Sequence, residues 1–105
     1  YRKNAWEQYG AEEKARLTAF ADDYRVFLDG AKTEREAAST AQQLCVEAGF
    51  RNLDVLIESG EPLGPGDRVY RKWMNKSFMA FVVGEEPIEK GMNILGAHID
   101  SPRLD

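Results

Sequence analysis

The spacing of apolar residues changes at residues 59–67, SGEPLGPGD, where closely spaced glycines and prolines favour a loop. Before this loop, apolar residues recur every three or four positions, as they do on one face of an α-helix. After it come two runs rich in aromatic and branched residues, 68–74 and 77–84, a composition typical of β-strands. The sequence therefore predicts a mixed α/β fold.

Two helices are predicted before the loop. The first spans about residues 2–29, with Gly10 separating a short leading helix, and the second spans about residues 33–48. Thr33 and Glu36 form the T-x-x-E pattern of a capping box, and Gly49 provides a C-terminal stop. Residues 50–58 are compatible with either a short helix or a strand.

Three strands are predicted after the helices. A β-hairpin spans about residues 68–84, and a third strand over about 92–99 is apolar enough to be covered on both faces. The predicted order is helix, helix, strand, strand, strand. Because such a sheet needs covering layers and partners at its edges, we expect the opening portion of a larger α/β unit, or a chain covered by other copies of itself.

Charge and cysteine content exclude several classes of protein. The net charge of −4 is opposite in sign to a nucleic-acid-binding surface, so no nucleic acid partner is expected. No apolar run approaches the ~20 residues of a membrane span, so no membrane contact is expected. Cys45 is the only cysteine, which predicts a cytoplasmic setting. It falls on the apolar face of its helix, which favours a buried thiol over a nucleophile paired with His98.

The only histidine, His98, lies two positions before Asp100 at the end of the predicted third strand. Residues two apart on a strand point to the same face, so the two side chains should lie together. Imidazole is a common metal ligand, and a neighbouring carboxylate can hold its tautomer. On spacing alone, an ordinary hydrogen-bonded histidine is the more common explanation of such a pair.

The residues around this pair favour the metal site. GAHIDSPRLD resembles the first metal-binding motif, G-x-H-x-D-S-P, of the aspartyl-aminopeptidase-like family of dizinc exopeptidases. Upstream, FLDGAKTERE, AGF and NKSFMAFVVG resemble further segments of that family in the same order.

The resemblance implies that His98 is a zinc ligand and that Asp100 is the catalytic carboxylate beside it, with Ser101 and Pro102 shaping the site. It further implies two zinc ions in the complete enzyme, peptide substrates that lose their N-terminal residue, and assembly into a homo-oligomer. The implied fold is a three-layer α/β/α domain.

The sequence departs from this family in one respect, because a two-zinc site needs further histidine and carboxylate ligands and this chain has no second histidine. We therefore expect residues 1–105 to form the N-terminal segment of a zinc aminopeptidase catalytic domain, inactive by itself. The alternative is a non-catalytic α/β module that self-associates or binds a partner. Such a module would use the amphipathic helix over 10–29 and the aromatic residues Trp6, Tyr9 and Tyr24.

Overall fold

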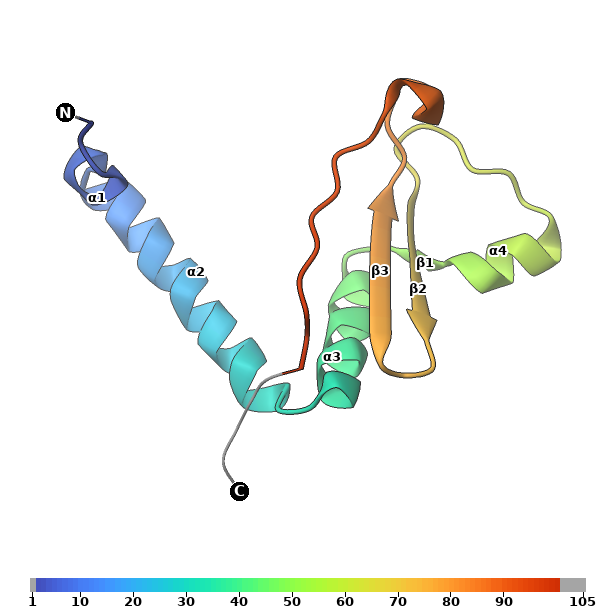
Figure 1. Ribbon diagram of the computed structural model, residues 1–105, viewed down its shortest axis with the longest axis horizontal. Helices are drawn as coiled ribbons and strands as arrows, with labels where there is room; N and C mark the ends of the chain where they lie inside the picture. The colour runs from blue at the N-terminus through green and yellow to red at the C-terminus, as the bar shows by residue number, and fades with distance from the viewer. Residues whose placement is uncertain (1, 101–105) are drawn as a thin grey trace.

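The computed structural model describes residues 2–100, and its fold is mixed α/β, as the sequence predicts. Figure 1 shows a long helix at one side of the molecule and a small sheet with its own helices at the other. The elements, in chain order, are α1 (Ala5–Gln8), α2 (Ala11–Gly30), α3 (Glu34–Glu47), β1 (Arg51–Asn52), α4 (Leu53–Ser59), β2 (Arg68–Trp73), β3 (Ser77–Val82) and the 3₁₀ turn η1 (Ile88–Lys90).

The predicted first helix is divided at Gly10 into α1 and α2. The carboxylate of Glu13 accepts a hydrogen bond of 2.7 Å from the backbone N–H of Gly10, which satisfies a donor at the start of α2. No helix within residues 2–100 combines the length and the apolar character that crossing a membrane requires.

The ends of α3 are those that its sequence predicts. The hydroxyl of Thr33 accepts a hydrogen bond from the N–H of Glu36 at 3.2 Å, and the Glu36 carboxylate accepts one from the N–H of Thr33 at 3.0 Å. This reciprocal pair is a capping box. At the other end Gly49 has a φ of 87°, and the N–H of Phe50 bonds back to the carbonyl of Cys45 at 2.8 Å. The left-handed glycine ends the helix.

The sheet has three strands in the order β1-β2-β3. β1 runs parallel to β2, and β2 pairs with β3 as an antiparallel hairpin in which Tyr70 lies opposite Ala80. The hairpin turns through Met74 and Asn75, which both have positive φ angles, 51° and 56°. Asparagine tolerates this conformation well, whereas methionine rarely adopts it.

The predicted third strand over 92–99 is not formed. These residues are described and have no strand assignment, and the third strand of the sheet is instead β1, from the segment that the sequence left undecided. The reason is that a strand exists only when another strand pairs with its backbone. Within residues 2–100, no backbone hydrogen bond joins this apolar segment to another.

The core lies between α3 and the hairpin. α3 packs against β2 and β3, where Ala37, Ala38 and Val69 are buried, and α4 packs beside β1 and β2 through Leu56. The Tyr70 and Phe78 rings stack with centroids 6.0 Å apart. These contacts fix the hairpin, whose turn borders the candidate site.

The molecule is expanded for its size. Its radius of gyration is 17.5 Å, against about 13 Å for a compact chain of this length. Its accessible surface is 9050 Å², against about 5,900 Å² for a compact monomer of 11.9 kDa. Much of the excess is apolar, since Phe20 is 74% exposed and Leu95 is fully exposed. The fold therefore presents surface that a compact protein would cover.

Candidate metal centre

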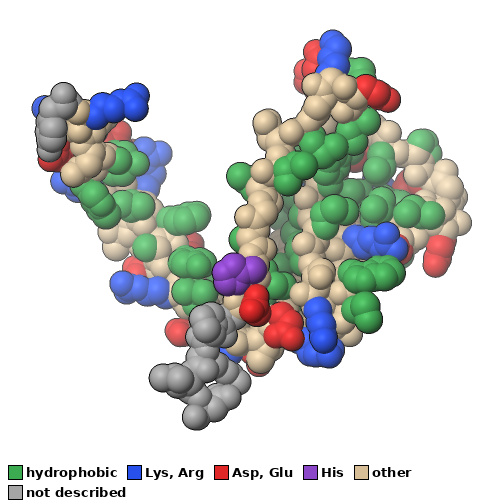
Figure 2. Space-filling view, in the orientation of Figure 1, with side chains coloured by type: hydrophobic (Ala, Val, Ile, Leu, Met, Phe, Trp, Pro, Cys, Tyr) green, Lys and Arg blue, Asp and Glu red, His purple; other side chains and the backbone are tan. Residues whose placement is uncertain are grey.

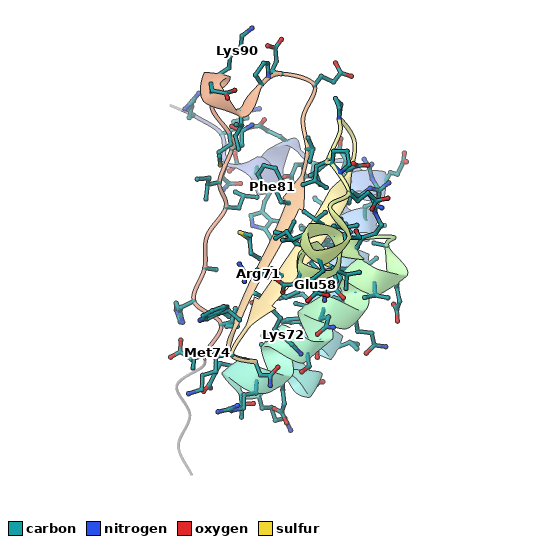
Figure 3. All side chains as sticks on the ribbon, turned by 90° about the vertical axis from the view of Figure 1, so that its right-hand side faces the viewer. Glu58, Arg71, Lys72, Met74, Phe81 and Lys90 are labelled. Carbon is teal, nitrogen blue, oxygen red and sulfur yellow. The ribbon has the colours of Figure 1, made fainter. Side chains whose placement is uncertain are left out.

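The candidate site lies on an extended segment, residues 91–100, that follows η1. Gly91, with a φ of 114°, starts this segment, which then runs alongside β3 toward the hairpin turn in both Figure 1 and Figure 3. His98 and Asp100 are thereby placed beside the start of β3 and the first turn of α3. The hollow around them measures about 540 Å³ and is lined by Glu34, Lys76, Ser77, Phe78, Ala97, His98, Ile99 and Asp100.

His98 and Asp100 lie together, although no strand holds them. Nδ1 of His98 is 3.0 Å from the backbone carbonyl oxygen of Asp100 and 3.2 Å from Oδ1 of its carboxylate. Both partners are oxygen acceptors, so Nδ1 must carry the proton and donate it. In a neutral imidazole this tautomer leaves the lone pair on Nε2, the arrangement that a metal-binding histidine uses.

Both side chains are open to solvent, with 80% of His98 and 74% of Asp100 exposed. Figure 2 shows the imidazole on the surface, in the notch between α2 and the sheet, with acidic side chains below it. Water that surrounds the pair competes with any ligand, so a catalytic site here needs further protein to exclude it.

His98 and Asp100 carry the types of ligand atom that zinc binds, but they supply only part of a zinc site. A tetrahedral zinc site takes nitrogen and oxygen ligands, three or four of them from protein. Within residues 2–100, no group of three histidine, cysteine or acidic side chains is placed to hold a metal. These described residues could therefore supply one nitrogen ligand, with a neighbouring carboxylate to orient it.

Two charged residues near the pair were not identified from the sequence. Glu34 is the first residue of α3, and Lys76 follows the left-handed turn of the hairpin. Both line the hollow around His98. Their positions depend on how the segment 91–100 lies against the hairpin, which no local pattern reveals. Ser101 and Pro102, which the family resemblance selects as shaping residues, lie outside the described residues.

Cys45 has the properties of a structural thiol. It is half-buried on α3, and burial raises the pKa of its thiol above the ordinary value. A nucleophilic cysteine needs a lowered pKa, so the structure gives no support to a Cys45–His98 hydrolase.

Three of the other carboxylates on which a metal site could draw are engaged elsewhere. Asp54 lies 3.1 Å from Nε of Arg71, and Glu61 and Asp67 lie 2.8 and 3.8 Å from the guanidinium of Arg51. These are exposed or half-exposed ion pairs, as expected for surface charge.

Comparison with known protein families identifies the family of this chain. The family described as "Aminopeptidase I zinc metalloprotease (M18)" matches residues 27–105, a stretch that begins in α2 and includes His98 and Asp100. The chain belongs to the M18 family. That membership confirms the predicted metallo-aminopeptidase family and its association with zinc.

Relatives in the M18 family cover almost the whole chain. A probable M18 family aminopeptidase 1 of Clostridium acetobutylicum is 40% identical over 103 residues, which are 98% of this chain and 22% of that protein. The corresponding protein of Borreliella afzelii is 38% identical over 104 residues, 99% of this chain and again 22% of the relative.

A solved structure agrees with the fold. The crystal structure of aminopeptidase I from Borrelia burgdorferi B31 superposes with a TM-score of 0.84 at 36% sequence identity. The superposition covers 97% of this chain and 24% of the Borrelia chain. The chain thus spans about a fifth to a quarter of the length of the relatives that it matches.

Proposed function

We propose that this chain is the N-terminal part of the catalytic domain of a zinc aminopeptidase, an enzyme that removes N-terminal residues from peptides. The observation that carries the proposal is the hydrogen-bonded His98–Asp100 pair within the stretch that matches the M18 family. Because the chain spans 22% of its relatives, the activity belongs to a larger protein.

In this proposal His98 binds zinc through Nε2. Asp100 accepts a hydrogen bond from the Nδ1–H group and holds the ring in the tautomer that leaves Nε2 free. When bound, zinc supplies a water of pKa about 7 and polarises the scissile carbonyl. The proposed complete enzyme holds two zinc ions, and Asp100 acts in it as a catalytic carboxylate.

The proposed setting is a cytoplasmic homo-oligomer that acts on peptides. A single cysteine, which cannot form an internal disulfide, supports an environment that keeps thiols reduced. The large exposed apolar surface supports association with further protein.

A chimera tests the proposal. The aligned stretch of the Clostridium acetobutylicum relative would be replaced by this chain, and zinc content and hydrolysis of aminoacyl p-nitroanilides would be measured. We expect the chimera to turn over substrate and the isolated 105-residue chain to be inactive even with added zinc.

Variants of the chimera assign the residues. His98→Ala should remove most zinc from its site and lower kcat/KM by at least 100-fold, because a ligand is lost. Asp100→Asn should weaken zinc binding about 10- to 100-fold, as loss of a supporting carboxylate does. Asn93→Ala, on the same segment but away from the pair, is the matched control and should leave both readouts unchanged. Full zinc content and activity in His98→Ala, or turnover by the isolated chain, would contradict the proposal.

The second candidate is a non-catalytic module that associates through α2. It has support from the exposed aromatic residues of that helix, Phe20 and Tyr24. Size-exclusion chromatography with and without zinc separates the two functions. A monodisperse low-order oligomer that does not respond to zinc, together with an inactive chimera, would favour the module.

A further inference from the structure

The turn of the β2–β3 hairpin brings a lysine beside the candidate metal ligand. Lys76 lines the same hollow as His98, and among the described residues it is the only lysine or arginine that does so. Figure 1 and Figure 3 show the turn, marked in Figure 3 by Met74, at the same end of the sheet as the C-terminal end of residues 91–100. Lys76 thus borders the space in which a ligand of His98 would lie.

The hairpin turn fixes the backbone of Lys76. Met74 and Asn75 are both left-handed, with φ angles of 51° and 56°, and the N–H of Lys76 donates to the carbonyl of Trp73 at 3.0 Å. Two successive residues in this conformation form a tight turn of the kind that joins hairpin strands. Trp73 also pairs with Ser77, which ties both sides of the turn into the sheet. The backbone is therefore held, while the long side chain of Lys76 is exposed and can adjust to a ligand.

The ammonium group of Lys76 is available to a ligand. Within residues 2–100, none of the ion pairs involves Lys76, although Glu34 lines the same hollow. Apart from His98, the other ionisable side chains of the hollow are the acidic Glu34 and Asp100. These two carboxylates repel an anionic ligand, so the attraction that the described side chains exert on such a ligand comes from Lys76.

We propose that Lys76 is a specificity-determining residue whose ammonium group binds a carboxylate of the peptide substrate close to the scissile bond. The inference rests on the proposed function and deepens it, because it adds a preference among peptides to their hydrolysis. Near neutral pH, carboxylates are the negatively charged groups of an unmodified peptide, so they are the groups that a lysine selects. Two of them can lie next to the first peptide bond: the side chain of an acidic first residue, and the C-terminal carboxylate of a dipeptide.

The size and kind of the effect follow from the exposure of Lys76. An ion pair between exposed groups contributes up to about a fivefold change in affinity. The carboxylate takes no part in the bond changes, so the ion pair stabilises the bound substrate and the transition state equally. Loss of such uniform binding raises KM and leaves kcat unchanged. A merely structural role of Lys76 would instead lower activity toward every peptide to the same extent.

Matched peptides test the proposal on the chimera with the Clostridium acetobutylicum relative. Comparison of Asp-Ala-amide with Asn-Ala-amide isolates the side-chain carboxylate, and comparison of Asn-Ala with Asn-Ala-amide isolates the C-terminal carboxylate. We expect KM to be about three- to fivefold lower for the peptide with the carboxylate in at least one comparison. The comparison that shows this preference identifies which carboxylate Lys76 binds.

Variants of Lys76 decide whether it is the source of the preference. Lys76→Ala should abolish the preference and Lys76→Glu should reverse it, with kcat unchanged in both. Lys76→Arg retains the charge and should retain the preference. Lys90→Ala is the matched control, because it removes a lysine at the opposite end of the segment, as Figure 3 shows, and should leave both comparisons unchanged.

Two results would overturn the proposal. One is that the chimera and its Lys76→Glu variant show the same KM ratios in both comparisons, and the other is that Lys76→Ala changes the kinetics of all three peptides equally. Failure of the proposed function would appear separately, as a chimera without turnover. Dissociation constants of the same three peptides, measured by isothermal titration calorimetry, then decide the proposal, and equal constants for charged and neutral peptides would refute it.

Discussion

Two regions of the molecule are equally apolar in sequence but differ in what covers them. The first is helix α3 with the β2–β3 hairpin, and the second is helix α2 with the segment 92–99. In the first region, which we call the packed region, Ala38 and Val69 are almost completely buried. In the second, the open region, Phe20 and Leu95 are exposed. The difference lies in the partners that the chain itself provides, not in the apolar character of the residues.

The open region also shows how helices and strands differ. α2 forms without a covering layer because its backbone hydrogen bonds are internal to the helix. Residues 92–99 have a strand-like sequence but cannot form a strand alone, because a strand's hydrogen bonds lie in another segment. The absence of a partner therefore leaves the helix intact and the strand unformed.

The largest expected effect is on stability beside the packed region, where α4 packs against β2. Leu56→Ala removes a buried side chain and should lower the free energy of unfolding by about 2–5 kcal/mol. Leu95→Ala, the same substitution at an exposed position in the open region, should change it by less than about 0.5 kcal/mol. Urea denaturation followed by circular dichroism measures both. Equal losses would show that the open region is covered in solution.

A smaller effect is expected at the start of α3. Thr33→Ala removes the hydroxyl that accepts from Glu36 and should cost about 1 kcal/mol, whereas Thr33→Ser keeps the capping oxygen and should cost much less. The same denaturation experiment measures the two variants. Equal losses in the two variants would show that the capping hydrogen bond of Thr33 does not stabilise the packed region.

The sequence predicted these local features because their determinants lie within a few residues of each other. Thr33 and Glu36 form the capping box, Gly49 ends α3, and the hairpin lies within the predicted range of about 68–84. Residues 50–58 could not be assigned, because β1 depends on pairing with β2, more than fifteen residues away. The strand over 92–99 was wrongly predicted for the same reason, since its composition indicates a strand without showing what would pair with it.

The candidate site was predictable in part. The spacing of His98 and Asp100 predicted that they lie together, and they do, through a hydrogen bond rather than a shared strand face. Glu34 and Lys76 come from elements 64 and 22 positions earlier than His98 in the sequence, so only the fold brings them to the same hollow.

The ion pairs of Arg51 should contribute less than the cap. Arg51 connects β1 to Glu61 and Asp67 in the following loop, but all three side chains are partly exposed. Arg51→Ala should cost about 0.2–1 kcal/mol at low salt, and the loss should shrink in 1 M NaCl because salt screens exposed charges. A salt-independent loss would point to packing of the arginine stem instead.

The smallest effect is on the chemistry of Cys45. Because burial raises its pKa, the folded chain should hold less thiolate at a given pH than the unfolded chain. Alkylation by iodoacetamide should therefore be slower in the native chain than in urea, with its pH midpoint shifted upward.

A cysteine placed in the open region is the control for this experiment. In the double variant Cys45→Ala and Ala19→Cys, the thiol lies on exposed α2 and should react at nearly the same rate in both states. If native Cys45 reacts as fast as this control, its thiol is as exposed as one in the open region, and the predicted burial of Cys45 is wrong.

The unpaired segment MNILGAHI, residues 92–99, has a further consequence for how this chain behaves at high concentration. It is eight residues long, free of proline and of acidic or basic side chains other than His98, and extended. Such segments stack into cross-β fibrils when they are left uncovered. The segment that carries the proposed metal ligand is thus also expected to drive aggregation of the isolated chain.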